Sequence, residues 1–157
     1  METLNFFSHE THVSLALPIG WEELKEEKAN VIYYYEVFEE GDESYELNPR
    51  FMIQLFPMPN TDASNLERAS KSNFEVEHVQ LEKLTHQNTT VDGYPGVVDV
   101  FTYQDQTYDT KMLQFQTFVL VDNVLFSFTG LSPDEYRADI VPMFEDAVNS
   151  VRFIFEF

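Results

Sequence analysis

One stretch of the chain is apolar on both of its alternating sides. Over Lys111–Val121 a period of two predicts a β-strand, with Phe115 on one face and Phe118 on the other. A strand that is apolar on both faces belongs to a sheet that is covered on both sides. The sequence therefore favours a layered fold in which a sheet lies between other elements.

Short strands separated by turn signals account for most of the remaining chain. The dipeptide Asp92-Gly93 between two β-rich runs is a strong signal for a two-residue hairpin. Glu22–Glu27 is expected to be a polar strand or a turn. We expect further strands over Asn5–Ser8, His12–Leu17, Val31–Phe38, Phe51–Phe56, Leu84–Val91, Val97–Tyr103, Val124–Thr129 and Arg152–Phe157.

A first helix is expected after the prolines that close the strand Phe51–Phe56. Asp62 or Ser64 can cap it, and Glu67 completes a capping box with Ser64. The helix is expected to end near residues 78–82. Its core-facing side at helical spacing comprises Leu66, Ala69, Ser70 and Phe74.

A second helix is expected near the carboxyl end. Ser132 is its predicted cap, with Pro133 at the first helical position. Pro142 is expected to kink or restart this helix, because proline removes a backbone donor. Its core-facing side comprises Tyr136, Ile140, Phe144, Ala147 and Val148.

The expected order is four or five strands, a helix, four strands, a helix and a final strand. This order predicts the α+β class, with a central, mostly antiparallel β-sheet flanked by helices. A length of 157 residues fits a single domain over residues 1–157.

The net charge of −19, from 9 basic and 28 acidic residues, restricts the partners. Such a surface repels phosphate backbones and anionic membranes, so nucleic acid is not an expected partner. It attracts a basic protein or peptide, although acidic surfaces also simply keep proteins soluble.

Cysteine is absent, which removes disulfides, thiolate nucleophiles and zinc–thiolate sites. The amino-terminal residues show no secretory leader, and no apolar run is long enough for membrane insertion. A cytoplasmic location is therefore expected. The oligomeric state stays open, and an exposed edge strand would allow a dimer.

No motif in the sequence carries chemistry, so we expect neither an enzyme nor a cofactor. The pair His9 and His12 lacks further ligands for a metal, and Asp105 with Asp109 does not follow the spacing of a calcium loop. A nucleophile turn and a glycine-rich phosphate loop are both missing. No catalytic residue and no metal ligand is predicted.

Two neighbouring features are candidates for partner contact. In the triplet of residues 33–35 alternation sends Tyr33 and Tyr35 to the same side of a strand, where exposed rings would suit an interface. Amphipathic packing of these rings at a sheet edge is the competing explanation. An acidic loop follows at Glu39–Asn48 and supplies the predicted contacts Glu39, Glu40, Asp42 and Glu43.

Four segments together resemble one fold family. They are Leu17–Trp21 after the opening strand, Thr90–Gly96, the strand pair Val119–Phe128, and the end of the last helix at Ser150–Phe153. In this order they resemble the Mog1/PsbP-like fold and its DUF1795 (DcrB-like) relatives, an α/β/α sandwich. The acidic loop Glu39–Asn48 is not part of the resemblance.

The resemblance implies a binding protein. Members of this family include a regulator of a nuclear-transport GTPase, subunits of the photosynthetic oxygen-evolving complex and cytosolic chaperones of secreted effectors. They bind partners and have no accepted catalytic site. The resemblance therefore implies an adaptor or an effector chaperone for this chain.

The leading hypothesis is a non-enzymatic, cytosolic module that binds a partner protein or a hydrophobic peptide segment against its sheet or in a groove beside it. The alternative is a carrier of a small molecule or lipid, with an apolar cavity lined by Phe115, Phe118 and Phe128. An enzyme with a cleft of shifted carboxylates is the third possibility.

Overall fold

The computed structural model describes residues 2–8, 11–25, 31–36, 48–57, 66–71 and 80–154. A helical segment occupies residues 66–71. The helix α2 spans Arg137–Asn149 and follows the single 3₁₀ turn η2, Asp134–Tyr136. The strands are β1 Thr3–Ser8, β2 Val13–Pro18, β3 Trp21–Lys25, β4 Val31–Glu36, β5 Arg50–Pro57, β6 Glu82–Val91, β7 Tyr94–Asp105, β8 Thr110–Val121, β9 Val124–Pro133 and β10 Arg152–Phe153.

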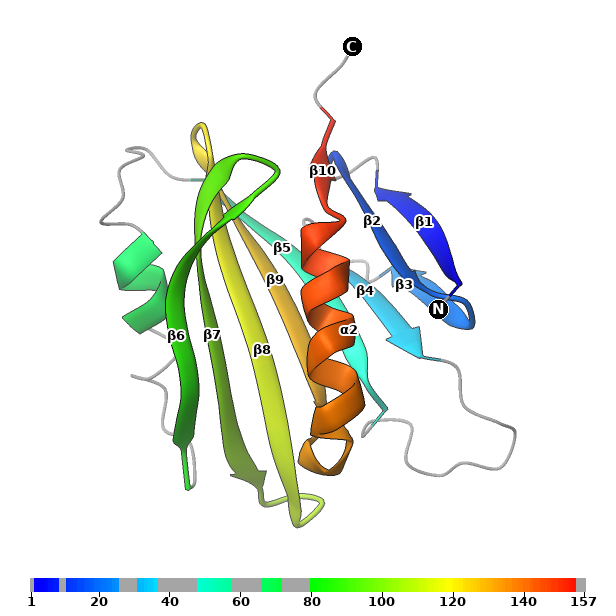
Figure 1. Ribbon diagram of the computed structural model, residues 1–157, viewed down its shortest axis with the longest axis vertical. Coiled ribbons are helices and arrows are strands. Elements are labelled where there is room, and N and C mark those ends of the chain that lie inside the picture. Colours follow the sequence, from blue (N-terminus) through cyan, green and yellow to red (C-terminus); the bar gives the residue numbers. More distant parts are fainter. Residues whose placement is uncertain are drawn as a thin grey trace.

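The described strands form two antiparallel sheets (Figure 1). The larger has seven strands in the order β3-β4-β5-β9-β8-β7-β6, and the smaller has three in the order β1-β2-β10. Strands that follow one another in the sequence are mostly hydrogen-bonded neighbours, as short hairpin connections require. The α+β class and the mostly antiparallel sheet flanked by helices are confirmed.

Helices lie on both faces of the large sheet. The helix α2 packs against β8, β9 and the small-sheet strand β2 (Figure 1). Its buried residues join Phe51 and Phe128 of the large sheet and Leu15 of β2 in the main core. On the opposite face Leu66 of the helical segment joins Phe118 in a second, smaller cluster. The expectation of a sheet covered on both sides is correct.

The two tight turns that contain glycine have the predicted backbone. Asp92 and Gly93 have φ values of 50° and 83°, which is the type I′ combination that joins two antiparallel strands. Gly20 ends the turn before Trp21 with a φ of 105°. Trp21 is buried in the main core, as expected for a residue that fixes the first strands.

The predicted start of the last helix is wrong. Ser132 and Pro133 are the final residues of β9, where they pair with Leu113 and Met112 of β8. The Ser132 hydroxyl donates to the Pro133 carbonyl, so it caps no helix. Pairing with the long strand β8 therefore extends β9 past the local cap signal.

Pro142 does not break the helix. It lies inside α2, which runs without interruption from Arg137 to Asn149. The prediction that Tyr136 faces the core is wrong, because its side chain is 44% exposed. The other four predicted core residues of this helix are buried, and Met143 is buried with them. Tyr136 precedes the first α-helical turn, so the helical spacing that placed it inward does not apply.

Several boundaries were predicted only approximately. The small sheet was not expected as a separate unit, because β10 reaches β2 from the far end of the sequence. The acidic loop Glu39–Asn48 lies outside the described residues except for Asn48. The cap of the first helix, residues 72–79 and residues 155–157 also lie outside the described part of the chain, and Glu82, the last residue of the interval expected for the end of this helix, is already the first residue of β6.

Candidate functional site

A groove with a volume of about 500 Å³ lies between α2 and the β6–β8 half of the large sheet. It forms because α2 lies over β8 and β9, which leaves the face of β6 and β7 without a helix above it (Figure 1). Val98, Val100 and Phe115 make its apolar floor. This size and this mixture of apolar floor and polar rim are typical of ligand sites in proteins.

The helix and the edge strand supply the two sides of this groove. From α2 come Val141 and Val148, and from β6 come the alternate residues Thr85, Gln87 and Thr89. The alternation follows from the pleat of the strand, which turns every second side chain toward the same face.

One buried hydroxyl in the groove lacks a hydrogen-bond partner. Thr117 on β8 lines the groove and is 1% exposed, and no described group hydrogen-bonds its Oγ1 atom. A buried hydroxyl without a partner costs free energy, which a ligand that supplies the partner would recover. The signal in the sequence was a polar residue at a position that alternation assigns to the core.

The charged groups at the rim differ in their pairing. Arg137 forms an ion pair with Asp134. The Oδ1 atom of Asp134 lies 2.8 Å from Nε of Arg137 and 2.8 Å from one of its terminal nitrogens. Glu145 is exposed on the next turns of α2, and within the described residues it forms no ion pair. The groove therefore presents an uncompensated negative charge.

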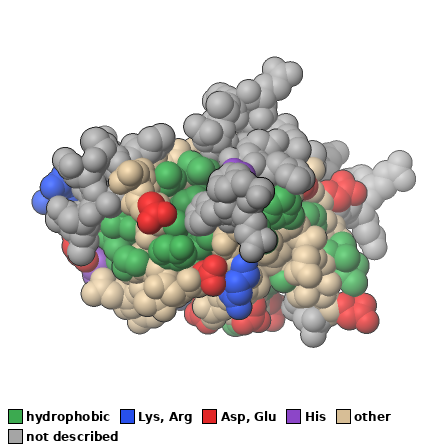
Figure 2. Space-filling view, turned by 90° about the horizontal axis from the view of Figure 1, so that it is seen from above, with side chains coloured by type: hydrophobic (Ala, Val, Ile, Leu, Met, Phe, Trp, Pro, Cys, Tyr) green, Lys and Arg blue, Asp and Glu red, His purple; other side chains and the backbone are tan. Residues whose placement is uncertain are grey.

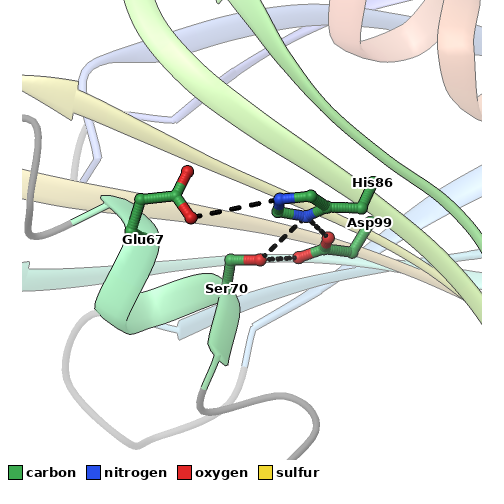
Figure 3. A network of polar contacts seen from close by, with 4 residues as sticks. All are labelled: Glu67, Ser70, His86 and Asp99. Carbon is green, nitrogen blue, oxygen red and sulfur yellow. Dashed lines mark hydrogen bonds and ion pairs between the residues drawn. The ribbon is translucent and has the colours of Figure 1, made fainter.

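A polar network attaches the helical segment to the opposite face of the sheet (Figure 3). Asp99 on β7 is completely buried, and its Oδ1 atom lies 2.6 Å from His86 Nδ1 on β6. Ser70 donates its hydroxyl to Asp99 Oδ2 at 2.7 Å. Glu67 lies 4.0 Å from His86 Nε2. The carboxylate is thus held by a residue from the sheet and a residue from the helix.

This arrangement of serine, histidine and aspartate differs from a nucleophilic triad. In a triad the carboxylate binds one imidazole nitrogen and the serine binds the other, which removes its proton. Here Ser70 and Asp99 both lie at Nδ1 of His86, and the serine proton points to the carboxylate. A hollow of about 410 Å³ beside the network has a rim of mixed charges, including Arg68, Lys71 and Lys83. The geometry indicates a structural anchor.

The network continues as a row of polar residues across four strands. His86, Asp99, Gln116 and Thr129 stand directly opposite one another on β6, β7, β8 and β9. Thr129 donates to Gln116 Oε1 at 2.7 Å, and Gln116 donates to Ser127 Oγ at 2.7 Å. Such a row fixes the register, because a slip by one residue would bury these groups without partners.

Of the predicted partner contacts, the structure places only the strand positions of Tyr33 and Tyr35. Tyr33 and Tyr35 pair with Met52 and Arg50 of β5, at the far side of the sheet from β6. The acids at positions 39, 40, 42 and 43 lie outside the described residues. Of the three phenylalanines expected to line a carrier cavity, Phe115 lines the groove, whereas Phe118 belongs to the cluster on the opposite face and Phe128 is buried in the main core.

Asp105 and Asp109, which lie among the described residues, are not part of a metal site there. Across the described residues no group of three or more histidine, aspartate or glutamate side chains is placed to hold a metal ion. Asp105 and Asp109 instead stabilise the turn between β7 and β8, where Asp105 accepts from the Tyr108 amide and Asp109 from Gln104. No helix in the described part of the chain is both long and apolar enough to cross a membrane.

Comparisons with known proteins identify the fold through solved structures. No protein-family model matches the sequence, and a search of curated proteins returns no match. LpqN of Mycobacterium tuberculosis, which is involved in cell envelope biogenesis, is similar with a TM-score of 0.71 at 10% identity, over 96% of this chain and 89% of that protein.

Two further structures are similar over nearly all of this chain. The cyanobacterial PsbP protein CyanoP from Synechocystis sp. PCC 6803 has a TM-score of 0.66 at 11% identity, over 96% of this chain and 92% of its own. A protein of Bacteroides thetaiotaomicron has a TM-score of 0.67 at 13% identity, and this chain spans 50% of its length. At these identities the likeness concerns the fold alone. The chain has the Mog1/PsbP-like fold.

Proposed function

We propose that this chain is a non-catalytic binding module that holds a segment of a partner protein in the groove between α2 and β6–β8. The observation that carries the proposal is a groove of about 500 Å³ whose apolar floor is Val98, Val100 and Phe115 and which lies beside an edge strand. Apolar side chains of a partner gain free energy when they leave water for such a surface.

The charge of the molecule favours a basic segment. The net charge is −19, and at the groove Glu145 adds a carboxylate with which no described residue forms an ion pair. Acidic and hydrophobic side chains lie beside one another on the end of the molecule seen in Figure 2. Complementary charge accelerates encounter and selects partners. The predicted contacts Tyr33, Tyr35, Glu39, Glu40, Asp42 and Glu43 and a cytoplasmic location stay predictions of this proposal.

Two neighbouring acids of α2 provide the test. Glu145 lines the groove and Asp146 does not, and both are exposed, so Glu145→Lys and Asp146→Lys change the net charge equally. Each variant and the wild type are used to capture proteins from a lysate of the source organism, with mass spectrometric identification. We expect one stoichiometric partner, lost with Glu145→Lys and kept with Asp146→Lys. Equal loss with both variants would show that overall charge, and not the groove, holds the partner.

A small amphipathic molecule is the second candidate occupant, favoured by the unpartnered hydroxyl of Thr117. A ligand with one hydrogen-bonding group and an apolar body would satisfy this hydroxyl while covering the floor. Native mass spectrometry of the purified protein tests it. A bound mass that disappears in Thr117→Val, which keeps the side-chain shape, would favour the carrier.

A further inference from the structure

The strand β6 forms one edge of the seven-stranded sheet, and no described residue pairs with its outer side. Natural edge strands are usually blocked by charges, prolines or bulges. At the other edge, β3 carries Glu22, Glu23 and Lys25. In β6 the bulge between Lys83 and Thr85 is followed by residues 85–90, whose sequence THQNTT contains neither a proline nor a lysine nor an acid.

The turn at Asp92-Gly93 determines which backbone groups of β6 face outward. In a type I′ hairpin the residues that flank the turn, here Val91 and Tyr94, exchange hydrogen bonds, and bonded pairs then alternate with non-bonded pairs. The pair Thr90 and Pro95 is therefore non-bonded, in agreement with the missing N–H of proline.

The same alternation makes His86, Asn88 and Thr90 the residues whose N–H and C=O groups point away from β7. The side chains of Asn88 and Thr90 are exposed, and His86 is exposed over 47% of its side chain. Within the described residues this edge thus presents three N–H donors and three carbonyl acceptors in the spacing of a regular strand, and the Thr90 carbonyl also accepts a 3.5 Å hydrogen bond from Thr89 Oγ1.

The edge and the groove are adjacent. Thr85, Gln87 and Thr89 line the groove with their side chains, while the backbone of the residues between them faces the open edge. A strand added along β6 would therefore turn every second side chain to the same face as the groove.

We propose that β6 accepts an extended segment of a partner as an additional strand, with alternating apolar and basic residues. The apolar side chains would enter the groove, and the side chains between them would face the hollow lined by Glu67, Arg68 and Lys71. The positive charge of the segment would be attracted by the net charge of −19. This inference rests on the proposed function, because it takes the groove as the docking site. A second copy of the chain fits less well as the occupant, because two molecules of net charge −19 repel each other.

The probe is a fluorescent ten-residue peptide that alternates valine and lysine, with two versions N-methylated on every second residue. One version is methylated at the residues whose N–H groups face β6, and the other at the residues between them. We expect the unmodified peptide to bind, one methylated version to bind at least about tenfold more weakly, and the other to bind unchanged. In the complex, hydrogen exchange should slow at the amides of Asn88 and Thr90.

A pair of protein variants provides the matched control. Asn88→Pro removes an outward N–H without removing a bond to β7, whereas Asn88→Ala keeps it. We expect only the proline variant to lose the peptide. Equal binding of both methylated peptides would overturn the added strand and leave the groove proposal standing. Protection of Asn88 and Thr90 without peptide, together with a dimer in sedimentation, would assign the edge to a second copy and overturn the inference, as would a peptide that fails to bind.

Discussion

Asp99 is a carboxylate without exposed surface, and its environment explains how the sheet tolerates it. His86 and Ser70 both place hydrogen-bond donors on its oxygens. Burial of a charge is costly unless such partners replace water. Because Ser70 belongs to the helical segment, the same contacts hold that segment on the sheet.

Ser70→Ala should therefore destabilise the fold. Loss of a hydrogen bond to a buried carboxylate should lower the free energy of unfolding by about 1.5–3 kcal/mol. Urea unfolding followed by circular dichroism measures this. Lys71→Ala, at the next and exposed position, is the control and should stay within about 0.5 kcal/mol of the wild type. Equal effects of the two substitutions would show that Ser70 is not an anchor.

Because Tyr103 is largely buried, we expect the protein to lose stability at alkaline pH. Burial, and next the Asp105 carboxylate, raise the pKa of Tyr103 above its ordinary value of 10.0, while Arg50 acts in the opposite direction. The folded state thus holds the phenol proton more tightly than the unfolded state. Its contribution is complete below the unfolded pKa of 10.0 and is lost as the pH rises toward the folded pKa.

Thermal unfolding at about pH 9 and about pH 11 measures this contribution. Tyr103→Phe should lose less stability between these pH values than the wild type does. Tyr108→Phe, at a tyrosine that is 42% exposed, should behave as the wild type. Identical pH dependence in all three proteins would contradict the burial of Tyr103.

The sequence could not assign a role to these residues. Asp99 interrupts the apolar run of Val97, Val98 and Val100, so a polar exception was visible, but its partner Ser70 lies 29 positions away. The same holds for Thr117, whose missing hydrogen bond depends on how α2 lies over the sheet. Local patterns identify a buried polar residue only by type, because its partners come from tertiary packing.

At the scale of elements, α2 depends on a close approach to β9. Gly130 lies under the Phe144 ring, and a β-carbon added at position 130 would stand 2.7 Å from the ring atoms. Phe144 also packs against Phe51 and Phe115, at ring-centroid distances of 6.0 Å. The ring therefore has little room to move away.

Gly130→Ala should displace the helix and destabilise the protein by about 1–3 kcal/mol, as overpacking does. The double variant Gly130→Ala with Phe144→Leu tests the cause. Denaturant unfolding measures how much each variant lowers the free energy of unfolding. We expect the double variant to lower it by less than the sum of the two single variants, because leucine at position 144 relieves the contact with the new methyl group. Additive losses would mean that the ring is not what opposes the new methyl group.

The sequence predicted which segments form strands and helices more accurately than it predicted where each one begins and ends. The alternation in β8 and the Asp92-Gly93 turn predicted their strands and hairpin correctly, since both signals are local. The start of α2 was missed because the capping signal at Ser132 competes with the pairing of β8 and β9, whose ten residue pairs include Ser132 and Pro133. Pro142 was expected to kink or restart this helix, but α2 continues through it from Arg137 to Asn149.

At the scale of the molecule, the excess of acids predicts a response to salt. A net charge of −19 repels itself in the compact state, and dissolved ions screen this repulsion. From about 20 mM to about 500 mM NaCl we expect Tm to rise by about 2–4 °C, the shift that ~1 kcal/mol produces in a protein of this size. A variant with Glu2→Gln, Glu22→Gln and Asp146→Asn should show a smaller rise. A flat or falling Tm in the wild type would contradict the prediction.

The overall class was predictable because the order of strands and helices restricts the possible layers. The division into two sheets was not, because β10 has only two residues and its pairing partner is near the other end of the chain. The groove was equally hidden from the sequence. The groove depends on which strands α2 leaves uncovered, and the position of a helix over a sheet cannot be predicted from a local residue pattern.

The small sheet also joins two segments that the ribosome makes at very different times, because β2 precedes β10 by most of the sequence. Its strand β2 pairs with β10, and the Ala16 amide donates to Ser150 Oγ, 134 residues further along the chain. A ribosome releases the amino end first, at about 5–20 residues per second. The segment of β1 and β2 is therefore synthesised seconds before β10, and during that time Leu15 and Leu17 lack the contacts that bury them in the folded protein. A chaperone that accompanies the nascent chain would have to shield this segment longer than any later strand.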